Sequence, residues 1–383
     1  MSERVAIVGI GWAGFRPSTP DVSYKEMIYE AAARAYNDAG VDPRKDVESF
    51  VTVAEDFHEG TSIFDEYTPD QLGAAMKSMH TITGDGLHGL ATAVMLIRTG
   101  RFDVVAVEGH SKASNILTPD TITAYAQDPV LNRPLRLNTH FVAGMEMNRY
   151  LYESGADEDA CARVAVKNRR NALTNPLASF AADLSQDEVL GGPCLAWPLG
   201  MHESAKSADG AVVMVLASEK AAASLTDKPV WIAGIGWCND SPSLESRAWG
   251  KLPYIEKAAY MAYRQAGIKN PFGEIDFAEI DDTYAYKELQ SLEALGVCGF
   301  GHAGALLKDG VFDPSGEFPV NVSGGSLGVG HLLDATGLHR ALEAALQLRS
   351  EAGARQLKEV CVGLVQSWRG VPTTSGAVAV LTN

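Results

Sequence analysis

The chain has 383 residues, of which 46% are hydrophobic, and its formal net charge is −16. This length and composition allow a substantial buried core, in two domains or in one duplicated fold. The negative charge repels DNA, RNA and anionic lipid, which excludes non-specific binding to nucleic acid. No run of 18 apolar residues is present, and the first four residues lead directly into a strand-like segment. We therefore expect no membrane span, no signal peptide and a cytoplasmic location.

The cysteines are scattered and form no C-x-x-C pair, which argues against a disulfide framework and against a zinc site. We expect the five of them to be reduced and buried: Cys161, Cys194, Cys238, Cys298 and Cys361. Cys361 lies in the apolar run EVCVGLV and is predicted to belong to the core. Cys298, in GVCGFG, is the one thiol that we expect in a loop able to approach a site.

The first apolar segment, VAIVGIGWAG at residues 5–14, has the Gly9-x-Gly11-x-x-Gly14 spacing of a dinucleotide-binding turn. That fingerprint requires the glycines to open a helix at once. Here FRPSTPD follows with two prolines, and helical spacing begins only near Tyr24. We therefore interpret the glycines as part of a buried strand and the turn after it.

This opening recurs later in the chain. VAIVGIGW at 5–12 matches VWIAGIGW at 230–237, an offset of 225 residues. The helices that follow end in AAARAYNDAGV (31–41) and AAYMAYRQAGI (258–268), and each leads into an acidic stretch and a strand. A period far above 50 residues predicts duplicated halves rather than a solenoid.

Each half reads strand, helix, strand, strand, helix, strand, which predicts α/β layers with strands buried on both faces. Two such βαβαββ-type halves, packed back to back, predict a five-layer αβαβα sandwich. We expect an N-terminal half over 1–228 and a C-terminal half over 229–383. The first half carries an inserted loop domain at about 114–225, with helices expected around 145–152 and 157–173, and we expect this insertion to cap a site.

A glycine-rich stretch at 321–337, NVSGGSLGVGHLLDATG, is the strongest candidate site. Its glycines permit positive φ and bring bare peptide N–H groups close to a ligand or to another strand: Gly324, Gly325, Gly328 and Gly330. His331 follows directly, and then the start of an apolar helix whose N–H groups face the same place. We expect Gly325 and Gly330 to lie against a substrate.

The pattern N-x-x-G-G-x-x-x-x-G-H-x-x-x-x-x-G resembles the histidine loop of the thiolase superfamily, in which the histidine polarises the thioester carbonyl of an acyl-CoA. The proline that usually follows this histidine is Leu332 here. GRFDVVAVEG at 100–109 and SADGA at 207–211 also resemble thiolase segments, and VAVKNRRNALTNPLA resembles the archaeal and sterol-carrier types. The resemblance covers essentially the whole chain and implies the thiolase fold.

In thiolases, a cysteine at the N-terminus of the buried first-half helix is acylated. The matching motif here is Thr83-Gly84-Asp85-Gly86, which contains no thiol. A cysteine at this place is reactive because the helix terminus and a histidine lower its pKa, whereas a threonine hydroxyl needs an adjacent base. We expect Thr83 to cap the helix, with a catalytic Thr83 as the alternative.

The family's H-D-x-F or N-E-x-F turn reads Asp281-Asp282-Thr283-Tyr284. A charged Asp281 has the wrong sign to stabilise an enolate oxygen, unless it is protonated or acts as a base. Asp282 matches the family's acid and is expected to be structural. Thr283 and Ser367 occupy the places of the second catalytic cysteine. The resemblance therefore argues against condensation through an acyl-enzyme.

Three functions remain open. The first is an enzyme that cleaves or forms a carbon–carbon bond beside the thioester carbonyl without an acyl-cysteine, such as a retro-aldol lyase, for which the steroid side-chain lyases are the family precedent. Tyr284 or Asp281 would be its base and His331 its electrophile, with His80, His88 and Asp85 as further acid–base candidates. The second is a non-catalytic subunit of an active paralogue. The third is an acyl-CoA thiolase or acyltransferase with an unrecognised nucleophile.

The resemblance implies a coenzyme A thioester as substrate or ligand, without a covalently bound cofactor or a metal. An anionic ligand on this acidic chain needs a local basic patch, for which Lys167, Arg169 and Arg170 are the candidates; the alternative is a solvated helix face. We expect a dimer through a first-half strand, because open sheet edges need covering. The resemblance also implies a thiolase paralogue or a small OB-fold zinc-ribbon protein as a partner.

Overall fold

The computed structural model describes residues 3–371 and 373–383. Within these ranges, nine strands form one mixed sheet in the order β3-β2-β4-β7-β1-β8-β11-β10-β9. The strands are β1 (Val5–Arg16), β2 (Ser49–Val53), β3 (Ser78–Ile82), β4 (Val104–Lys112), β7 (Asp209–Ser218), β8 (Val230–Asn239), β9 (Phe277–Glu279), β10 (Val362–Trp368) and β11 (Ser375–Thr382). The short strands β5 (Cys194–Ala196) and β6 (Leu199–Gly200) pair apart from this sheet.

The helices of the first half and its insertion are α1 (Tyr24–Ala39), α2 (Asp56–Glu59), α3 (Phe64–Tyr67), α4 (Pro69–Leu72), α5 (Gly86–Arg98), α6 (Pro119–Tyr125), α7 (Thr139–Ser154), α8 (Glu158–Asn171), α9 (Gln186–Leu190) and α10 (Glu219–Leu225). Those of the second half are α11 (Pro253–Ala266), α12 (Pro271–Glu274), α13 (Ala285–Ala294), α14 (Ala303–Lys308), α15 (Gly325–Val329) and α16 (Thr336–Leu348). The two helices expected in the insertion are therefore confirmed as α7 and α8. In this part of the chain, no helix combines the length and the apolar character needed to cross a membrane.

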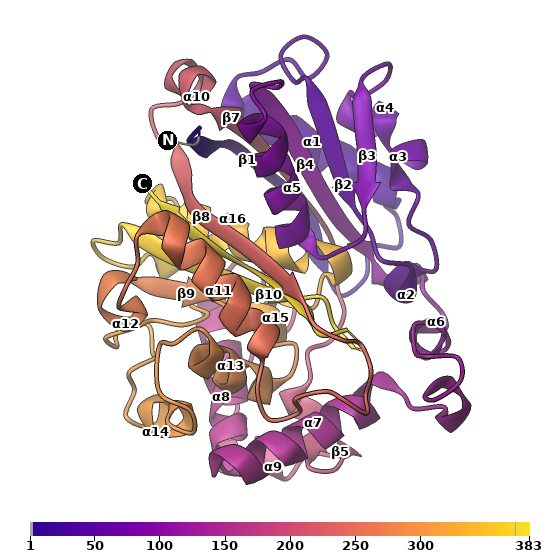
Figure 1. Ribbon diagram of the computed structural model, residues 1–383, viewed down its shortest axis with the longest axis vertical. Coiled ribbons are helices and arrows are strands. Elements are labelled where there is room, and N and C mark those ends of the chain that lie inside the picture. Colours follow the sequence, from indigo (N-terminus) through magenta and orange to yellow (C-terminus); the bar gives the residue numbers. More distant parts are fainter. Residues whose placement is uncertain (1–2, 372) are drawn as a thin grey trace.

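The sheet shows the internal duplication. From its centre it runs β1-β7-β4-β2 in one direction and β8-β11-β10-β9 in the other, so the strands of the two halves correspond in order. β1 and β8, which carry the repeated sequence, meet through only two residue pairs, Ala6–Trp231 and Ile7–Val230. Figure 1 shows β1 to β4 in indigo and purple beside β8 and the yellow C-terminal strands.

The repeated glycines serve close packing of a helix on a strand. A Cβ on Gly9 or Gly11 would overlap the backbone of α1, and a Cβ on Gly234 or Gly236 would overlap the backbone of α11. β1 continues through its glycines as far as Arg16, so they do not form the turn of a dinucleotide site. Both halves thus use the same glycines for the same packing.

The core is layered as predicted. One hydrophobic cluster lies between α1 and the first-half strands, and another lies between the second-half strands and α11, α13, α7 and α8. The cluster between them contains α5 and α16 together with strand residues of both halves. α16 is buried along its whole length. The five-layer α/β sandwich is therefore confirmed, with α5 and α16 as its central layer.

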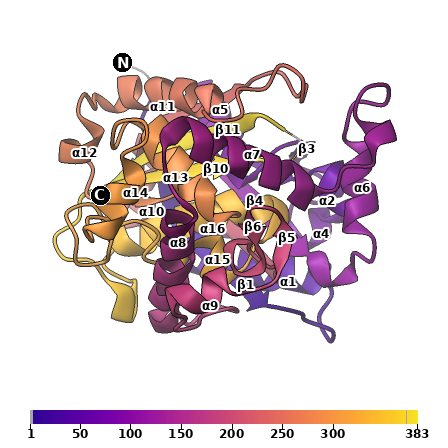
Figure 2. The same ribbon diagram turned by 90° about the horizontal axis from the view of Figure 1, so that it is seen from below.

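The loops after first-half strands contact the loops of the second half. Glu55 follows β2, and its carboxylate pairs with Arg369, which follows β10. The backbone N–H of Glu55 donates to Asp334 over 2.9 Å. Asp85, after β3, accepts from Ser367 at the end of β10. Figures 1 and 2 both show α6 of the insertion beside α2, at the periphery of the same region. The fold thus gathers the candidate residues of both halves at one place.

Candidate active site

Asp85 joins the N-termini of the two central helices. Its carboxylate accepts hydrogen bonds from the Leu87 N–H of α5 at 3.0 Å and from the Gly337 N–H of α16 at 2.8 Å, and from the Ser367 hydroxyl. A carboxylate here is stabilised by the unpaired N–H groups of both helices. Burial nevertheless raises the pKa of Asp85 to about 6, against the effect of these hydrogen bonds. Asp85 therefore fixes both helix starts and ties them to β10.

Thr83 lies outside this cap. The prediction that Thr83 caps α5 is wrong, because the helix begins at Gly86 and the carboxylate of its N-cap Asp85 reaches the free N–H of Leu87. Thr83 is exposed, and among the described residues its hydroxyl has no acid or base as a partner. It lines a cavity of about 540 Å³ together with Glu55 and Arg369. In the ranges that the structure describes, Thr83 thus has no hydrogen-bonded base that would activate it as a nucleophile.

His331 is held by its backbone on the segment before β7. Its N–H donates to the Lys206 carbonyl at 2.8 Å, and its carbonyl accepts from the Ala208 N–H at 3.0 Å. Burial, and to a smaller extent the neighbouring His58, lowers the pKa of His331 to about 3. The imidazole is therefore neutral at pH 7, with one ring N–H to donate to a carbonyl oxygen.

A second histidine, which sequence reasoning missed, lies beside it. The ring of His58, on α2, packs edge to face on the ring of His331, with 6.0 Å between centroids. Nδ1 of His58 is 2.6 Å from Oδ1 of Asp334, and Oδ2 of Asp334 accepts from the Glu55 N–H. Burial lowers the pKa of His58, but the Asp334 carboxylate, together with Glu55 and Glu59, more than offsets this, so the pKa is raised overall.

The other ring nitrogen of His58 is open to a ligand. The side chain is 14% exposed, and in the part of the chain that the structure describes Nε2 has no hydrogen-bond partner. The loop after β10 passes close by, since a Cβ on Gly370 would lie 3.4 Å from this nitrogen. With Nδ1–H donated to Asp334, Nε2 has its lone pair free and can accept a proton.

Asp281 and Asp282 share a buried arginine. NH1 of Arg340, on α16, is 3.0 Å from Oδ2 of Asp281, and its NH2 is 3.6 Å from Oδ1 of Asp282. Asp282 also accepts from the backbone N–H groups of Ser326 at 2.6 Å and Leu327 at 3.1 Å, which anchors the start of α15. From the sequence, a charged Asp281 was expected to oppose an enolate oxygen, unless it was protonated or acted as a base. In the structure, the guanidinium supplies the opposite charge.

Tyr284 and His331 both pair with the segment 204–207, which precedes β7. The backbone of Tyr284 bridges to Ser204 and that of His331 bridges to Ser207, three residues further on. At about 3.3 Å per residue the two backbones are roughly 10 Å apart. Burial raises the pKa of Tyr284 well above its usual range, although a hydrogen bond with Thr139 opposes this. The phenol therefore stays protonated and is suited to donate a hydrogen bond rather than to accept a proton.

The other candidate histidines lie apart from this pair. His88 is buried within α5, with Nε2 at 3.4 Å from the Ser375 hydroxyl, and burial lowers its pKa to about 3. His80 lies on β3, and burial lowers its pKa as well. Over the described ranges, neither ring contacts His331.

Gly325 and Gly330 pack against protein atoms. Both have positive φ, +57° and +118°. A Cβ on Gly325 would overlap the Asp282 carboxylate, and one on Gly330 would lie 2.6 Å from the Cβ of Ala208. These glycines position the loop that carries His331.

The three predicted basic residues do not form one exposed patch. Lys167 is buried, with Nζ at 3.1 Å from Glu288 and 2.8 Å from the Val320 carbonyl. Arg169 is buried and donates to the carbonyls of Phe180 and His202. Arg170 is exposed and pairs with Asp183 at 2.9 Å. Lys167 and Arg170 do line a hollow of about 650 Å³, with Arg163 and Arg355 on its walls.

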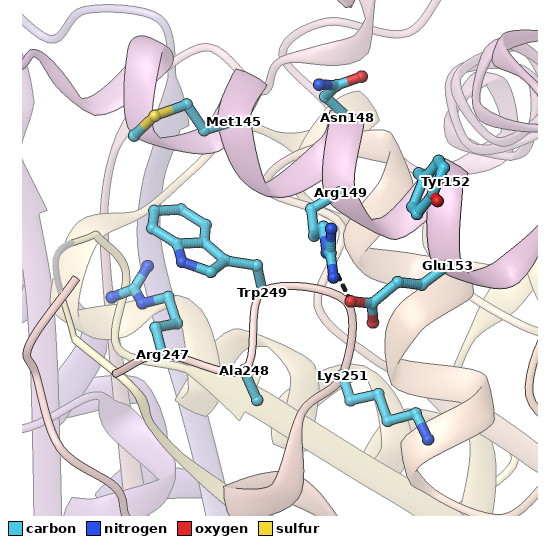
Figure 3. Close-up of a pocket in the computed structure, with 9 residues that line it drawn as sticks. All are labelled: Met145, Asn148, Arg149, Tyr152, Glu153, Arg247, Ala248, Trp249 and Lys251. Atoms are coloured by element: carbon cyan, nitrogen blue, oxygen red, sulfur yellow. Dashed lines mark hydrogen bonds and ion pairs between the residues drawn. The ribbon is translucent and has the colours of Figure 1, made fainter. Parts of the chain in front are cut away.

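A second surface hollow, of about 670 Å³, lies between α7 and the loop before α11. Figure 3 shows Trp249 of this loop close to Arg247 and facing Met145 of α7. Arg149 pairs with Glu153 at 2.5 Å across one turn of α7. This hollow also combines cationic and aromatic side chains.

The expectation of five buried cysteines is wrong. Only Cys161 is buried, whereas Cys194 and Cys361 are exposed. Cys361 precedes the strand that was expected to contain it, because β10 begins at Val362. Cys298 is partly buried, and burial raises the pKa of its thiol to about 12, so it is not a reactive thiolate.

Comparison with known proteins gives consistent similarities. Residues 239–383 match the family described as Thiolase C-terminal domain-like. Acetyl-CoA acetyltransferase of Methanothermobacter thermautotrophicus is 28% identical over 98% of this chain and 98% of that protein. Sterol carrier protein 2 of Oryctolagus cuniculus is 28% identical over 94% of this chain and 69% of that protein. A solved structure described as Ltp2-ChsH2(DUF35) aldolase has a TM-score of 0.84 and 26% identity, over 99% of this chain and 97% of that one.

Proposed function

Because the chain belongs to the thiolase superfamily, in its sterol-carrier-like branch, we propose that it cleaves a β-hydroxyacyl-CoA by a retro-aldol route without an acyl-enzyme. The observation that carries this proposal is the His58–Asp334 pair beside a neutral His331. The pair is assembled from two segments that lie 276 residues apart in the sequence. The similarity to an aldolase structure supports the same reaction class.

In the proposed reaction, Nε2 of His58 takes the proton of the β-hydroxyl group. The C–O bond becomes a carbonyl, the bond between the α and β carbons breaks, and its electron pair passes to the thioester as an enolate. The imidazolium of His58 then returns the proton to the α carbon. The products are an aldehyde or ketone and a shortened acyl-CoA. Asp334 orients the imidazole and stabilises its charged form.

The enolate oxygen needs hydrogen-bond donors that are already in place. We assign the ring N–H of His331 to this role, because its neutral imidazole keeps one N–H that can donate to the enolate oxygen. The protonated phenol of Tyr284 is the second donor along the same segment. Asp281 is not assigned as the base, because Arg340 binds its carboxylate.

We place the phosphates of CoA in the hollow lined by Arg163, Lys167, Arg170 and Arg355, which lies between α8 and the segment leading to the His331 loop. Calorimetry with CoA tests this. Arg163→Gln combined with Arg170→Gln should weaken binding about tenfold, since Arg170 is exposed and Arg163 is partly exposed, so that both can reach phosphate. Arg149→Gln, in the hollow of Figure 3, is the matched control. If only the control weakens binding, the nucleotide lies in that hollow.

We further propose a self-dimer and a small OB-fold zinc-ribbon partner. β3 is the outer strand of the sheet, and its free edge is suited to pairing with a second copy. The insertion presents apolar side chains to solvent, with Leu117 90% and Val130 77% exposed, which suits a partner chain. Native purification followed by light scattering and mass spectrometry tests both. A lone monomer at micromolar concentration would contradict both.

Turnover tests the proposed reaction directly. The purified chain, with whatever co-purifies, is incubated with a 3-hydroxyacyl-CoA, and aldehyde release is followed by coupled reduction. We expect release that depends on enzyme concentration. Binding of CoA without release would instead favour a non-catalytic subunit of an active paralogue.

A further inference from the structure

A further cavity, of about 460 Å³, lies at the end of β4 between α3 and α6. Its walls combine aromatic and aliphatic side chains with polar ones, among them Tyr24, Phe64, Ile122, Glu59 and His110. Apolar walls with polar groups placed among them are typical of a site for a small organic group. The volume suits a ring-sized group.

Glu59 places an unused acceptor in this cavity. Its side chain is only 8% exposed, and the Lys112 backbone N–H holds the carboxylate. Oε2 has no hydrogen-bond partner in the part of the chain that the structure describes, and Nε2 of His110 is 3.9 Å away. A buried acceptor without a partner is costly, so a ligand donor at this place would be stabilised.

The surroundings of Glu59 are rigid. Nδ1 of His110 is 2.9 Å from Glu108, and the Thr52 hydroxyl donates to the same carboxylate. The ring of Tyr24 stacks on that of His110, with 5.4 Å between centroids, and Phe64 meets His110 edge-on at 4.6 Å. The polar end of the cavity is therefore formed before any ligand binds.

The titratable groups at this end favour a hydroxyl group as the donor. Burial lowers the pKa of His110, but Glu108 and Glu59 more than offset this and raise it to about 9. The imidazolium lies between the Glu108 and Glu59 carboxyl groups, and the Lys112 ammonium is paired with Asp209 at 2.8 Å, so both cations already have partners. Burial raises the pKa of Glu59 to about 7, so near neutral pH its carboxyl group is present in both forms. A hydroxyl group suits both forms, because it can donate to the carboxylate and accept from the acid.

The cavity adjoins the candidate active site. Glu59 directly follows His58 on α2, and Ile122 of α6 lines both this cavity and the one beside Thr83. Gly60, which lines the cavity beside Thr83, lies next to Ile122: a Cβ on it would be 3.6 Å from Cδ1. A group that extends from a thioester beside His58 past Ile122 would reach Glu59.

We propose that this cavity binds the far end of the substrate's acyl group, and that Glu59 accepts a hydrogen bond from a hydroxyl group on a ring there. The proposal rests on the proposed function, because it assigns the acyl part of the same CoA thioester. It names the substrate class as CoA thioesters whose acyl group ends in a hydroxylated ring.

Calorimetry on the full chain, with any co-purifying partner, tests this with three probes: CoA, 3-phenylpropanoyl-CoA and 3-(4-hydroxyphenyl)propanoyl-CoA. We expect the hydroxylated thioester to bind about tenfold more tightly than the unsubstituted one, because the hydrogen bond satisfies a buried oxygen that has no partner among the described residues. Glu59→Met should remove this preference and Glu59→Gln should keep part of it. Glu66→Met, an exposed neighbour on α3, should leave it unchanged.

A second variant keeps the test decisive if Glu59→Met does not fold. Ile122→Trp should block the passage, so that both ring-bearing thioesters lose affinity while CoA binds as before. Equal binding of the two thioesters to the unmodified chain would overturn this inference and leave the proposed function standing. Failure of CoA and of both thioesters to bind would overturn both.

Discussion

The turn before α5 and the loop before α16 occupy corresponding places in the two halves, but they differ in chemistry. Both lead into a central helix, and Asp85 caps both helix starts. Before α5, Thr83 is exposed and has no base beside it among the described residues. Before α16, His331 lies against His58, and Asp334 is within 2.6 Å of that second histidine. The comparison teaches that a helix N-terminus alone does not make a nucleophile.

The physical reason lies in the groups themselves. A helix N-terminus stabilises an anion by roughly 0.3–1 kcal/mol, up to about 2 kcal/mol in favourable buried geometry. That stabilisation helps a thiol, whose usual pKa is about 8.5, to ionise at neutral pH. It is far too small to ionise a threonine hydroxyl. The proposed chemistry therefore belongs to the loop before α16, where imidazole groups transfer protons near pH 7.

The largest effect is expected from His58→Gln. Glutamine keeps much of the side-chain volume but cannot take up a proton, so kcat for aldehyde release should fall about 10²- to 10⁴-fold. Steady-state kinetics with a 3-hydroxyacyl-CoA measure this, with circular dichroism as the control for folding. A loss below about threefold would remove His58 from the mechanism.

His331→Gln should have the next largest effect. Loss of the ring N–H removes one donor to the enolate oxygen and should lower kcat about 10²- to 10³-fold, with a smaller change in KM. The readouts are kcat, KM and the melting temperature. A residue with a purely structural role would lower the melting temperature as well as kcat. An unchanged kcat would mean that groups other than His331 donate to the enolate oxygen.

Asp334→Asn should lower the rate less and should move the pH profile. In the unmodified protein, kcat/KM should rise with pH as His58 loses its proton, with the midpoint above 6.5 because the Asp334 carboxylate raises this pKa. Without the carboxylate, burial should bring the pKa below 6.5 and move the rising limb to lower pH. The plateau should fall roughly tenfold to a hundredfold, less than when the imidazole is lost. A rising limb of the pH profile at the same pH in both proteins would contradict the pairing of His58 with Asp334.

Thr83→Ala should have the smallest effect, a change in kcat below about twofold, because the hydroxyl has no activating partner. Thr83→Cys sharpens the comparison: a thiol, whose usual pKa is about 8.5, is partly ionised near neutral pH without a base, so the variant should be slowly acetylated by acetyl-CoA, which peptide mapping would detect. A large loss of activity in Thr83→Ala would indicate that Thr83, in the turn before α5, acts as the nucleophile.

Sequence reasoning predicted what depends on local pattern and repetition. The duplicated glycines of β1 and β8, the helices α7 and α8 and the histidine loop could each be read from spacing. The pairing of His58 with Asp334 could not, because it joins segments 276 residues apart through the packing of α2 on the second half. In the same way, Arg340 looks like an ordinary helix residue in the sequence, and only the fold places it against Asp281.

Errors arose where one or two residues decide the outcome. Thr83 was expected to cap α5, but the N-cap is Asp85, two residues later, whose carboxylate accepts from the Leu87 N–H. Cys361 was placed inside a buried strand that begins one residue after it. Lys167 was taken for a surface cation, yet its ammonium lies buried beside Glu288. Periodicity does not resolve such shifts, because helix and strand ends depend on tertiary contacts.

Mass spectrometry of a quenched reaction tests the central claim most directly, because one sample reports both product and enzyme. The purified chain is mixed with a 3-hydroxyacyl-CoA, quenched with acid within one turnover, and measured for shortened acyl-CoA and for intact protein mass. The account predicts shortened acyl-CoA together with an unmodified protein mass. An acyl adduct that maps to Thr83, formed and consumed as product appears, would contradict it.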